Sequence, residues 1–170
     1  MNSLVVMGVA GCGKSSLGRE VARATGRPLV EGDDFHSETS RAKMRAAVPL
    51  TDADRDAWLD TLARELRRHP HGAVLTCSAL KRRYRERLRA ASPGLRFVFL
   101  ELNEAAAHAR VAARAGAHLF PPALVASQFA ALEAPLGEPG VLRLDATREL
   151  AALREETLRW LDEVAPPEGD

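Results

Sequence analysis

The sequence predicts an α/β fold in which a parallel five-stranded sheet is flanked by helices. Three observations support this prediction. Five short apolar runs alternate with longer amphipathic stretches, each run is apolar at consecutive positions as in strands buried on both faces, and a glycine-rich loop joins the first run to a helix-like stretch. Because ligands bind at the carboxyl ends of the strands in such a sheet, the residues that follow each run are the first candidates for function.

The strands and the first helix can be placed from the pattern of apolar residues. The predicted strands span residues 3–7, 28–31, 73–77, 95–100 and 141–144. The first helix follows the glycine-rich loop, from residue 16 to residue 24.

The later helices are predicted from caps and apolar stripes. Thr51 and Asp54 resemble a capping box, with Asp in place of the usual Glu or Gln. One apolar stripe follows: Trp58, Leu59, Leu62, Ala63 and Leu66. The next helix is predicted to carry a repeat of four residues: Leu80, Tyr84 and Leu88. Thr147 is expected to cap a last helix, whose apolar positions are Leu150, Leu153, Leu158 and Leu161.

The composition is that of an ordinary globular domain. The chain has 170 residues, 46% of them hydrophobic and 28% charged, and a formal net charge of +1, so no global field favours nucleic acid or an anionic membrane. No apolar run reaches the roughly 18 residues of a membrane span, and the first residues lead directly into a strand, which leaves no room for a signal peptide. The two cysteines, Cys12 and Cys77, form no zinc pattern. We expect a cytoplasmic protein with reduced thiols.

A complete phosphate-binding loop, of the pattern G-x-x-x-x-G-K-[ST], follows the first predicted strand. Backbone N–H groups of such a loop, and the positive end of the helix after it, bind a polyphosphate. Lys14 can reach the β- and γ-phosphates of ATP, and the Ser15 hydroxyl can ligate Mg²⁺. The residues predicted to bind ATP here are Gly8, Val9, Ala10, Gly11, Cys12, Gly13, Lys14, Ser15 and Ser16.

Acidic residues follow the second predicted strand, in the stretch Glu31-Gly32-Asp33-Asp34-Phe35-His36. A carboxylate at this strand end faces the phosphate loop. Asp33 is therefore placed to accept a proton from an attacking hydroxyl, or to orient Mg²⁺ through water. Asp34 is a competing carboxylate, and the sequence does not separate the two.

Cationic and hydroxyl side chains come later in the chain. Arg55 lies among acidic residues, so it can pair with them or clamp a substrate carboxylate with two hydrogen bonds. Ser78 and Lys81 follow the third predicted strand and offer polar and cationic groups to an anionic substrate. That strand lacks the terminal Asp that holds Mg²⁺ in many phosphate-loop NTPases. Its absence argues against a GTPase or a motor ATPase and assigns the metal to Ser15, water and Asp33.

Arginines occur in two groups, a basic run at residues 81–89 and a pair at Arg110 and Arg114. Residues 81–89 are strongly basic, but at helical spacing the arginines spread over the surface without an aromatic platform, so we expect no nucleic-acid binding. Arg110 and Arg114 lie four residues apart, hence on one helix face, before a turn-forming segment at 116–122. In small kinases, arginines on a mobile lid close over ATP; the alternative here is a surface helix with two solvated arginines.

In these stretches the chain resembles the bacterial gluconokinases, the thermoresistant type within the shikimate-kinase-like phosphate-loop kinases. The matching stretches keep the family order from residue 4 to about residue 135. The phosphate loop is shared widely. The most specific stretches are Gly32-Asp33 with His36, Cys77-Ser78-Ala79-Leu80-Lys81, and Ser127-Gln128-Phe129 with Leu132-Glu133.

The resemblance implies ATP-dependent phosphorylation of D-gluconate at its 6-hydroxyl, with Mg²⁺. Asp33 would act on the reacting hydroxyl, Arg55 and Lys81 would bind negative charge, and His36 and Ser78 would bind hydroxyls.

The resemblance also assigns the lid residues and a partner. By analogy with related kinases, Arg110 would pack on adenine and Arg114 would approach the transferred phosphoryl group, so that Lys14, Asp33 and Arg114 form the catalytic set. His118 would reach the substrate from the lid. The family also suggests a homodimer, with no nucleic-acid or membrane partner.

Three departures from the family pattern are visible. Ser37 and Ser40 stand where the family has Pro and Asn, and Ser40 can still bond a hydroxyl at shorter reach. Ala47 replaces a Gly, so the turn there is expected to differ. In the lid, His118 comes one residue later than expected and Leu119 replaces Phe, which predicts a lid one residue longer.

We expect a single kinase domain over residues 1–164, with a lid at about 110–122, a substrate-binding segment at about 33–58, and a frayed tail at 165–170. Two other functions stay open: another small-molecule kinase of this group, such as a shikimate kinase, and a nucleotide-binding module without catalysis. The sequence blocks after the third strand and around Gln128 disfavour shikimate kinase, and the complete set of Lys14, Ser15 and Asp33 disfavours loss of catalysis.

Overall fold

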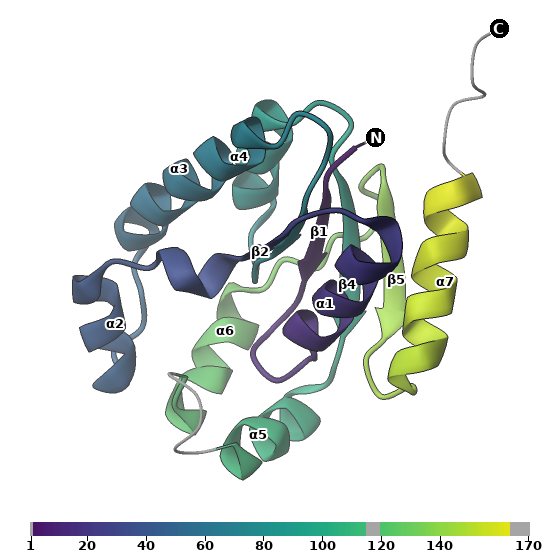
Figure 1. Cartoon of the computed structure of the whole chain (residues 1–170). Helices are drawn as coiled ribbons and strands as arrows, with labels where there is room; N and C mark the ends of the chain where they lie inside the picture. Colours follow the sequence, from purple (N-terminus) through teal and green to yellow (C-terminus); the bar gives the residue numbers. More distant parts are fainter. Residues whose placement is uncertain (1, 115–119, 164–170) are drawn as a thin grey trace, which may run out of the picture.

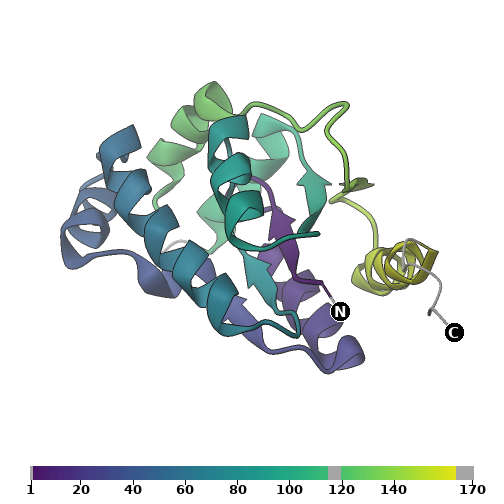
Figure 2. The same ribbon diagram turned by 90° about the horizontal axis from the view of Figure 1, so that it is seen from above.

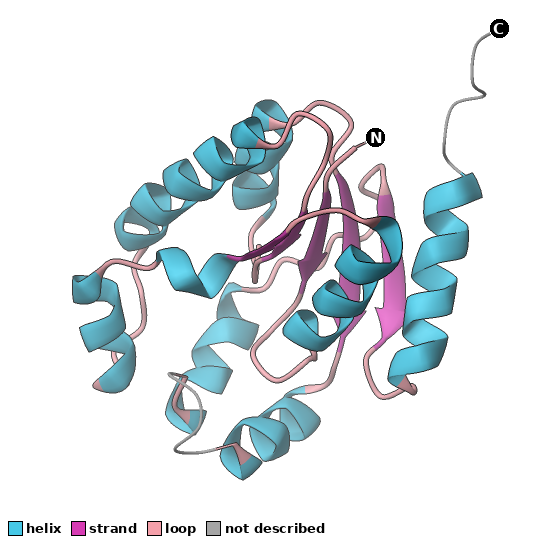
Figure 3. Ribbon diagram, viewed as in Figure 1, coloured by secondary structure: helices cyan, strands magenta, loops and turns pink. Residues whose placement is uncertain are grey.

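The computed structural model of the protein describes residues 2–114 and 120–163. Five parallel strands form one sheet in the order β2-β3-β1-β4-β5, and Figure 3 shows them between layers of helices. Their bounds are Leu4–Met7 (β1), Leu29–Glu31 (β2), Val74–Thr76 (β3), Arg96–Glu101 (β4) and Val141–Asp145 (β5). The predicted fold class is confirmed, and each strand end lies within one residue of its predicted position.

Helices cover both faces of the sheet, with α3 and α4 on one face and α1 and α7 on the other (Figures 1 and 2). The α-helices are Lys14–Thr25 (α1), Glu38–Arg45 (α2), Asp52–Arg68 (α3), Arg82–Ala91 (α4), Glu104–Ala113 (α5), Val125–Ala131 (α6) and Leu150–Glu163 (α7). Two short 3-10 helices, η1 (Gly32–Phe35) and η2 (Pro122–Leu124), lie beside the sheet edge that carries the site.

Alternate residues of each strand supply the two halves of the core, because successive side chains of a strand point to opposite faces. On β1, Leu4 and Val6 pack with the helices α1 and α7, whereas Val5 and Met7 pack with α3 and α4. All four are fully buried. The central strand is therefore apolar throughout, as its sequence predicted.

Two helix starts differ from the prediction. Leu80 is buried, but α4 begins only at Arg82, so Leu80 belongs to the loop after β3. Thr147 does not cap α7, which begins at Leu150. Its hydroxyl and N–H both donate to the Asp145 carboxylate, so Thr147 closes the turn after β5 instead.

The basic run on α4 faces an acidic row on α3. Arg83 and Arg87 pair with Asp56, and Arg87 also pairs with Asp60. These pairs neutralise the arginines locally, and the absence of nucleic-acid binding stays a prediction. Within residues 2–114 and 120–163, no helix has both the length and the apolar character needed to cross a bilayer.

Candidate active site

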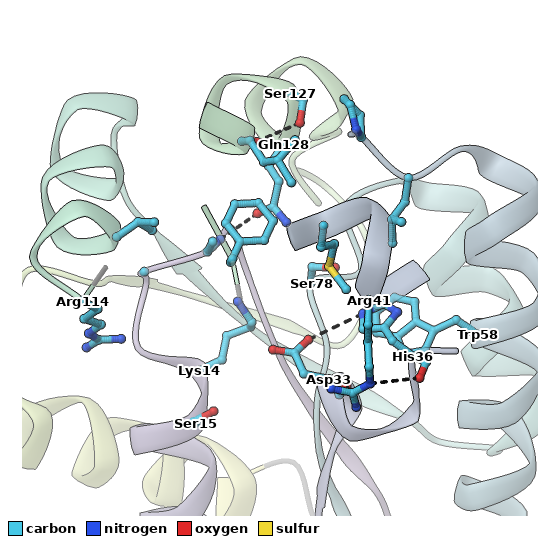
Figure 4. A pocket seen from close by; sticks show the side chains of 18 of the residues that line it. Lys14, Ser15, Asp33, His36, Arg41, Trp58, Ser78, Arg114, Ser127 and Gln128 are labelled. Carbon is cyan, nitrogen blue, oxygen red and sulfur yellow. Dashed lines mark hydrogen bonds and ion pairs between the residues drawn. The ribbon is translucent and has the colours of Figure 1, made fainter. Parts of the chain in front are cut away.

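A cavity of about 330 Å³ opens at the carboxyl edge of the sheet (Figure 4). This volume is in the range typical of small-ligand sites. The predicted site residues that line it are Ala10, Gly11, Gly13, Lys14, Ser15, Ser16, Asp33, His36, Arg55, Ser78 and Arg114. Segments far apart in the sequence thus meet in one space, as expected for the carboxyl ends of parallel strands.

The phosphate loop forms one wall of this cavity. Gly13 has a φ of 96°, in the left-handed region that favours glycine, and it directly precedes α1. The Lys14 Nζ donates to the carbonyl oxygens of Gly8 at 3.0 Å and Val9 at 3.1 Å. The ammonium group is thereby held over the loop, at the mouth of the helix whose unpaired N–H groups attract anions.

Ser15 has a carboxylate partner that the sequence reasoning did not use. Its hydroxyl donates to Glu31 Oε2 at 3.0 Å, and the Thr76 hydroxyl donates to the same oxygen at 2.5 Å. Glu31 ends β2 and Thr76 ends β3. The available signal was the place of Glu31 at the end of the second strand, one residue before Gly32.

The oxygen donors around Ser15 suit Mg²⁺, which prefers oxygen ligands and usually keeps several waters beside substrate phosphates. Within the described ranges, no group of three or more His, Cys, Asp and Glu side chains could hold a metal by itself. An ion here would therefore rest on Ser15, nucleotide phosphates and water, with Glu31 as a nearby carboxylate.

The opposite wall of the cavity carries Asp33 and His36 on and just after η1. The Trp58 indole N–H donates to the Gly32 carbonyl oxygen at 2.8 Å, and the His36 ring stacks on the Trp58 ring with centroids 4.4 Å apart. His36 Nε2 lies 3.8 Å from Asp33 Oδ1. Burial lowers the pKa of His36 below its usual value; the neighbouring Asp33 opposes this shift, and the guanidinium groups of Arg41 and Arg55 add to it.

Arg41 is a cationic lining residue that the sequence reasoning missed. It lies on α2, and its guanidinium donates to the carbonyl oxygens of Asp33 at 3.1 Å and His36 at 3.3 Å. Figure 4 shows it beside these two residues. Arg41 thus braces the turn that presents Asp33. It stands in the middle of a polar helix, where one more arginine gives no sequence signal.

The start of α3 positions Arg55, which lines the cavity. The predicted capping box is confirmed: Asp54 N–H donates to Thr51 Oγ1, and Thr51 N–H donates to Asp54 Oδ2. Lys43 of α2 also binds Asp54, at 2.8 Å. The Lys43 ammonium, with the Thr51 hydrogen bonds, lowers the pKa of Asp54 to about 2, so this carboxylate fixes α2 to α3 at neutral pH.

Ser78 and Lys81, both predicted to bind the substrate, take different positions in the loop after β3. Ser78 lines the cavity. Lys81 is not among the lining residues, because its ammonium binds Asp52 at 3.0 Å, beside the Tyr84 hydroxyl that also donates to Asp52. A role for Lys81 in substrate binding would require it to leave this pair.

The two predicted lid arginines take different positions. Arg114, the C-cap residue directly after α5, lines the cavity. Arg110 does not; its guanidinium donates to the carbonyl oxygens of Gly11 at 3.2 Å and Ala146 at 3.1 Å, so it joins the phosphate loop to the turn after β5. His118, Leu119 and the rest of 115–119 lie outside the described residues, as does the predicted tail at 165–170.

Comparison with known proteins identifies the family of this chain. A family model described as an AAA domain matches residues 4–139. The gluconokinase of Gluconobacter oxydans (strain 621H) is 41% identical over 160 residues, which cover 92% of this chain and 89% of that protein. The chain belongs to the gluconokinase family. The thermosensitive gluconokinase of Escherichia coli (strain K12) is 37% identical, covering 91% of this chain and 84% of its own length.

A solved gluconokinase shares the fold. The crystal structure of a gluconokinase from Sinorhizobium meliloti 1021 matches 96% of this chain and 93% of its own, with a TM-score of 0.88 and 42% identity. The chain therefore has the P-loop NTPase fold of this kinase family, together with the nucleotide-binding loop expected from its sequence.

Ser37, Ser40 and Ala47, which depart from the gluconokinase pattern, lie at the two ends and in the interior-facing part of the α2 region. The Ser37 hydroxyl caps α2 by accepting from the Ser40 N–H at 3.1 Å, and Ser40 is buried rather than exposed to the cavity. Ala47 has a φ of 56°, which lies in the region that glycine occupies without strain. Ala47 therefore keeps a backbone conformation suited to glycine.

Proposed function

We infer that this chain transfers the γ-phosphoryl group of ATP to the 6-hydroxyl of D-gluconate, giving 6-phosphogluconate and ADP. The observation that carries this proposal is a single cavity in which the phosphate loop faces Asp33 and Arg55, in a chain of the gluconokinase family. Gluconate is a polyol with one carboxylate, so it needs one cationic partner and several neutral hydrogen-bonding partners.

The chain's residues divide the reaction between them. Lys14 and Arg114 would neutralise charge on the transferred phosphoryl group, and the loop amides would hold the polyphosphate. Mg²⁺, when bound beside Ser15, would neutralise phosphate oxygens. Asp33 would accept the proton of the 6-hydroxyl, because it lines the cavity and is braced by Arg41 and His36.

The acceptor side would hold the rest of gluconate. Arg55 would bind the carboxylate, and His36 and Ser78 would contact hydroxyls, since all three line the cavity. Arg110 would pack on adenine beyond the loop. The roles of Lys81 and His118, the lid motion at about 110–122, the single domain over 1–164, the homodimer and the cytoplasmic location stay predictions from the sequence and the resemblance.

The proposal is tested by a coupled assay for ADP release with Mg-ATP and a panel of gluconate, shikimate, AMP and no acceptor. ADP release that depends on gluconate alone would support direct transfer to this acid. Release only with shikimate or AMP would move the chain to another kinase specificity. Measurable ATP binding without transfer to any member of the panel would favour a nucleotide-binding module.

A further inference from the structure

The short helix α6 places one side chain, Gln128, against the phosphate loop. Gln128 Oε1 accepts a hydrogen bond from the Ala10 N–H at 2.7 Å, across 118 residues of sequence. Figure 4 shows the carboxamide entering the cavity from α6. We propose that Gln128 is a positioning residue with two contacts, in which Oε1 fixes the phosphate loop at Ala10 and Nε2 donates to a hydroxyl of the sugar-acid acceptor.

The orientation of the carboxamide follows from the donor it meets. A carboxamide has one accepting oxygen and an NH₂ group that only donates. Because the Ala10 N–H is a donor, the atom that faces it must be oxygen, and Nε2 is directed to the other side of the group. Among residues 2–114 and 120–163, no hydrogen bond is formed by Nε2, although Gln128 lines the cavity.

The helix that carries Gln128 is fixed to the acceptor side of the cavity. Just after α6, the Glu133 N–H donates to the Leu80 carbonyl oxygen at 2.7 Å, and the Glu133 carboxylate accepts from the Arg82 N–H at 2.8 Å. Arg85, which is fully buried, donates to the carbonyl oxygens of Ala79 and Glu133, both at 2.8 Å. Gln128 therefore joins the phosphate loop to a segment that is held by the loop after β3.

The chemistry of the Gln128 NH₂ group, which has no partner among the described residues, favours the acceptor over the phosphoryl group. Two cations, Lys14 and Arg114, already line the cavity with residues of the phosphate loop and can serve the phosphoryl group, whereas a polyol needs neutral donors. The neighbouring Ser127 hydroxyl is already used, since it donates to the carbonyl oxygen of Leu124, at the end of η2, at 2.8 Å. This inference rests on the proposed function, because it takes gluconate as the acceptor.

Two variants of Gln128 test its two contacts. Gln128→Met keeps the size but removes both hydrogen bonds, so we expect about a 3- to 10-fold weaker affinity for ADP and a similar increase in the gluconate KM. Gln128→Glu keeps an oxygen for the Ala10 N–H and removes the donor. It should raise the gluconate KM at least as much as Gln128→Met. Its added negative charge beside the loop also weakens binding of the ADP phosphates, so the loop contact is judged from Gln128→Met alone. ADP binding is measured by calorimetry without acceptor, and thermal melting verifies that each variant is folded.

A comparison with deoxygenated acceptors gives a readout that a purely structural role would not produce. Gluconates that lack one of the hydroxyls at C2 to C5 are assayed with the wild type and with Gln128→Met. When the missing hydroxyl is the one that Nε2 contacts, the kcat/KM of the wild type should be about 3- to 10-fold lower than with gluconate. The kcat/KM of Gln128→Met should be almost the same for that deoxy acceptor and for gluconate, because this variant has already lost the contact. The control variant Ala126→Met puts a methionine at an exposed position of α6. It should leave the ADP affinity and the gluconate KM unchanged.

Each outcome decides one part of the proposal. A gluconate KM within about twofold of wild type in both Gln128 variants, or equal losses on every deoxy acceptor, would overturn the contact with the substrate. Unchanged ADP affinity in Gln128→Met would overturn the contact with the loop. A wild-type protein without gluconate-dependent turnover would refute the proposed function and the substrate contact together, while ADP binding would still decide the loop contact.

Discussion

The two walls of the cavity are built in different ways. The phosphate wall comes from one continuous stretch, β1, the loop and the start of α1. Its lysine, Lys14, is held by its sequence neighbours Gly8 and Val9, and Gln128 and Arg110 hold the loop from distant segments. The acceptor wall is assembled from η1, α2, α3 and the loop after β3, and its contacts join distant residues, such as Trp58 with Gly32. Loss of a group from the first wall should therefore affect chemistry directly, whereas changes in the second should divide between chemistry, substrate affinity and folding.

The largest expected effect is on the phosphate wall. Lys14→Ala should lower kcat/KM by about 10³-fold, because a preorganised cation facing the phosphoryl group contributes several kcal/mol to its transition state. Steady-state kinetics would measure the loss. Retention of a tenth or more of the wild-type kcat/KM would contradict the role of Lys14.

The next effect tests which carboxylate acts on the acceptor wall. Asp33→Asn should lower kcat by roughly 10²-fold or more and change the KM for ATP little, because the general base is lost while nucleotide contacts remain. Asp34→Asn is the matched control, since Asp34 also lines the cavity, whereas Asp33 is the carboxylate beside His36. Near-normal turnover of Asp33→Asn, or the opposite ranking of the two variants, would remove Asp33 as the base.

A third prediction concerns Arg55, the residue proposed to bind the carboxylate of gluconate. Arg55→Ala should raise the gluconate KM by about 10- to 100-fold with little change in the KM for ATP, as expected for loss of charge-assisted hydrogen bonds. Lys81→Ala should have a smaller effect, because Lys81 is engaged with Asp52. Equal effects of the two substitutions would show that Lys81 leaves its ion pair to bind substrate.

The fourth prediction is a pH dependence of stability that arises from His36. Its folded-state pKa is lowered, chiefly by burial, so below the unfolded-state value of about 6.5 the unfolded chain binds more protons. The stabilisation is present above about pH 6.5 and is lost as the pH falls through the lowered pKa. Urea unfolding between pH 5 and 8 should show this slope, and His36→Gln should reduce it. His108→Gln, at an exposed position on α5, should leave it unchanged.

The smallest expected effect is a gain in stability at Ala47. The N–H groups of Ala47 and Val48 bond the carbonyl oxygens of Met44 and Lys43, as in a Schellman motif at the end of α2, and Ala47 is the left-handed residue. Ala47→Gly should raise the free energy of unfolding by about 0.5–1 kcal/mol, seen as a higher urea midpoint. Ala46→Gly, at a φ of −84°, should lower that midpoint instead.

The contrast between the walls also explains what the sequence could predict. The strands, the phosphate loop and the Thr51–Asp54 capping box depend on neighbouring residues, and all were found as predicted. The hydrogen-bond partners of Glu31 and Gln128 lie on distant segments, so the sequence placed these residues at a strand end and in a specific stretch without indicating what they contact. For the same reason Lys81, predicted to bind substrate, was found paired with Asp52.

Gly32 directly precedes Asp33 and lies where the main chain after β2 passes close to β3. A Cβ atom at this position would lie 2.2 Å from the Thr76 carbonyl oxygen, so the main chain at the start of η1 lies directly against the end of β3. The backbone at Asp33, one residue later, is thus placed by main-chain contact, and the side chains of Arg41 and Trp58 brace the same turn. An engineer who wants this kinase to accept a shorter or longer sugar acid should keep Asp33 and vary the proposed carboxylate partner, Arg55.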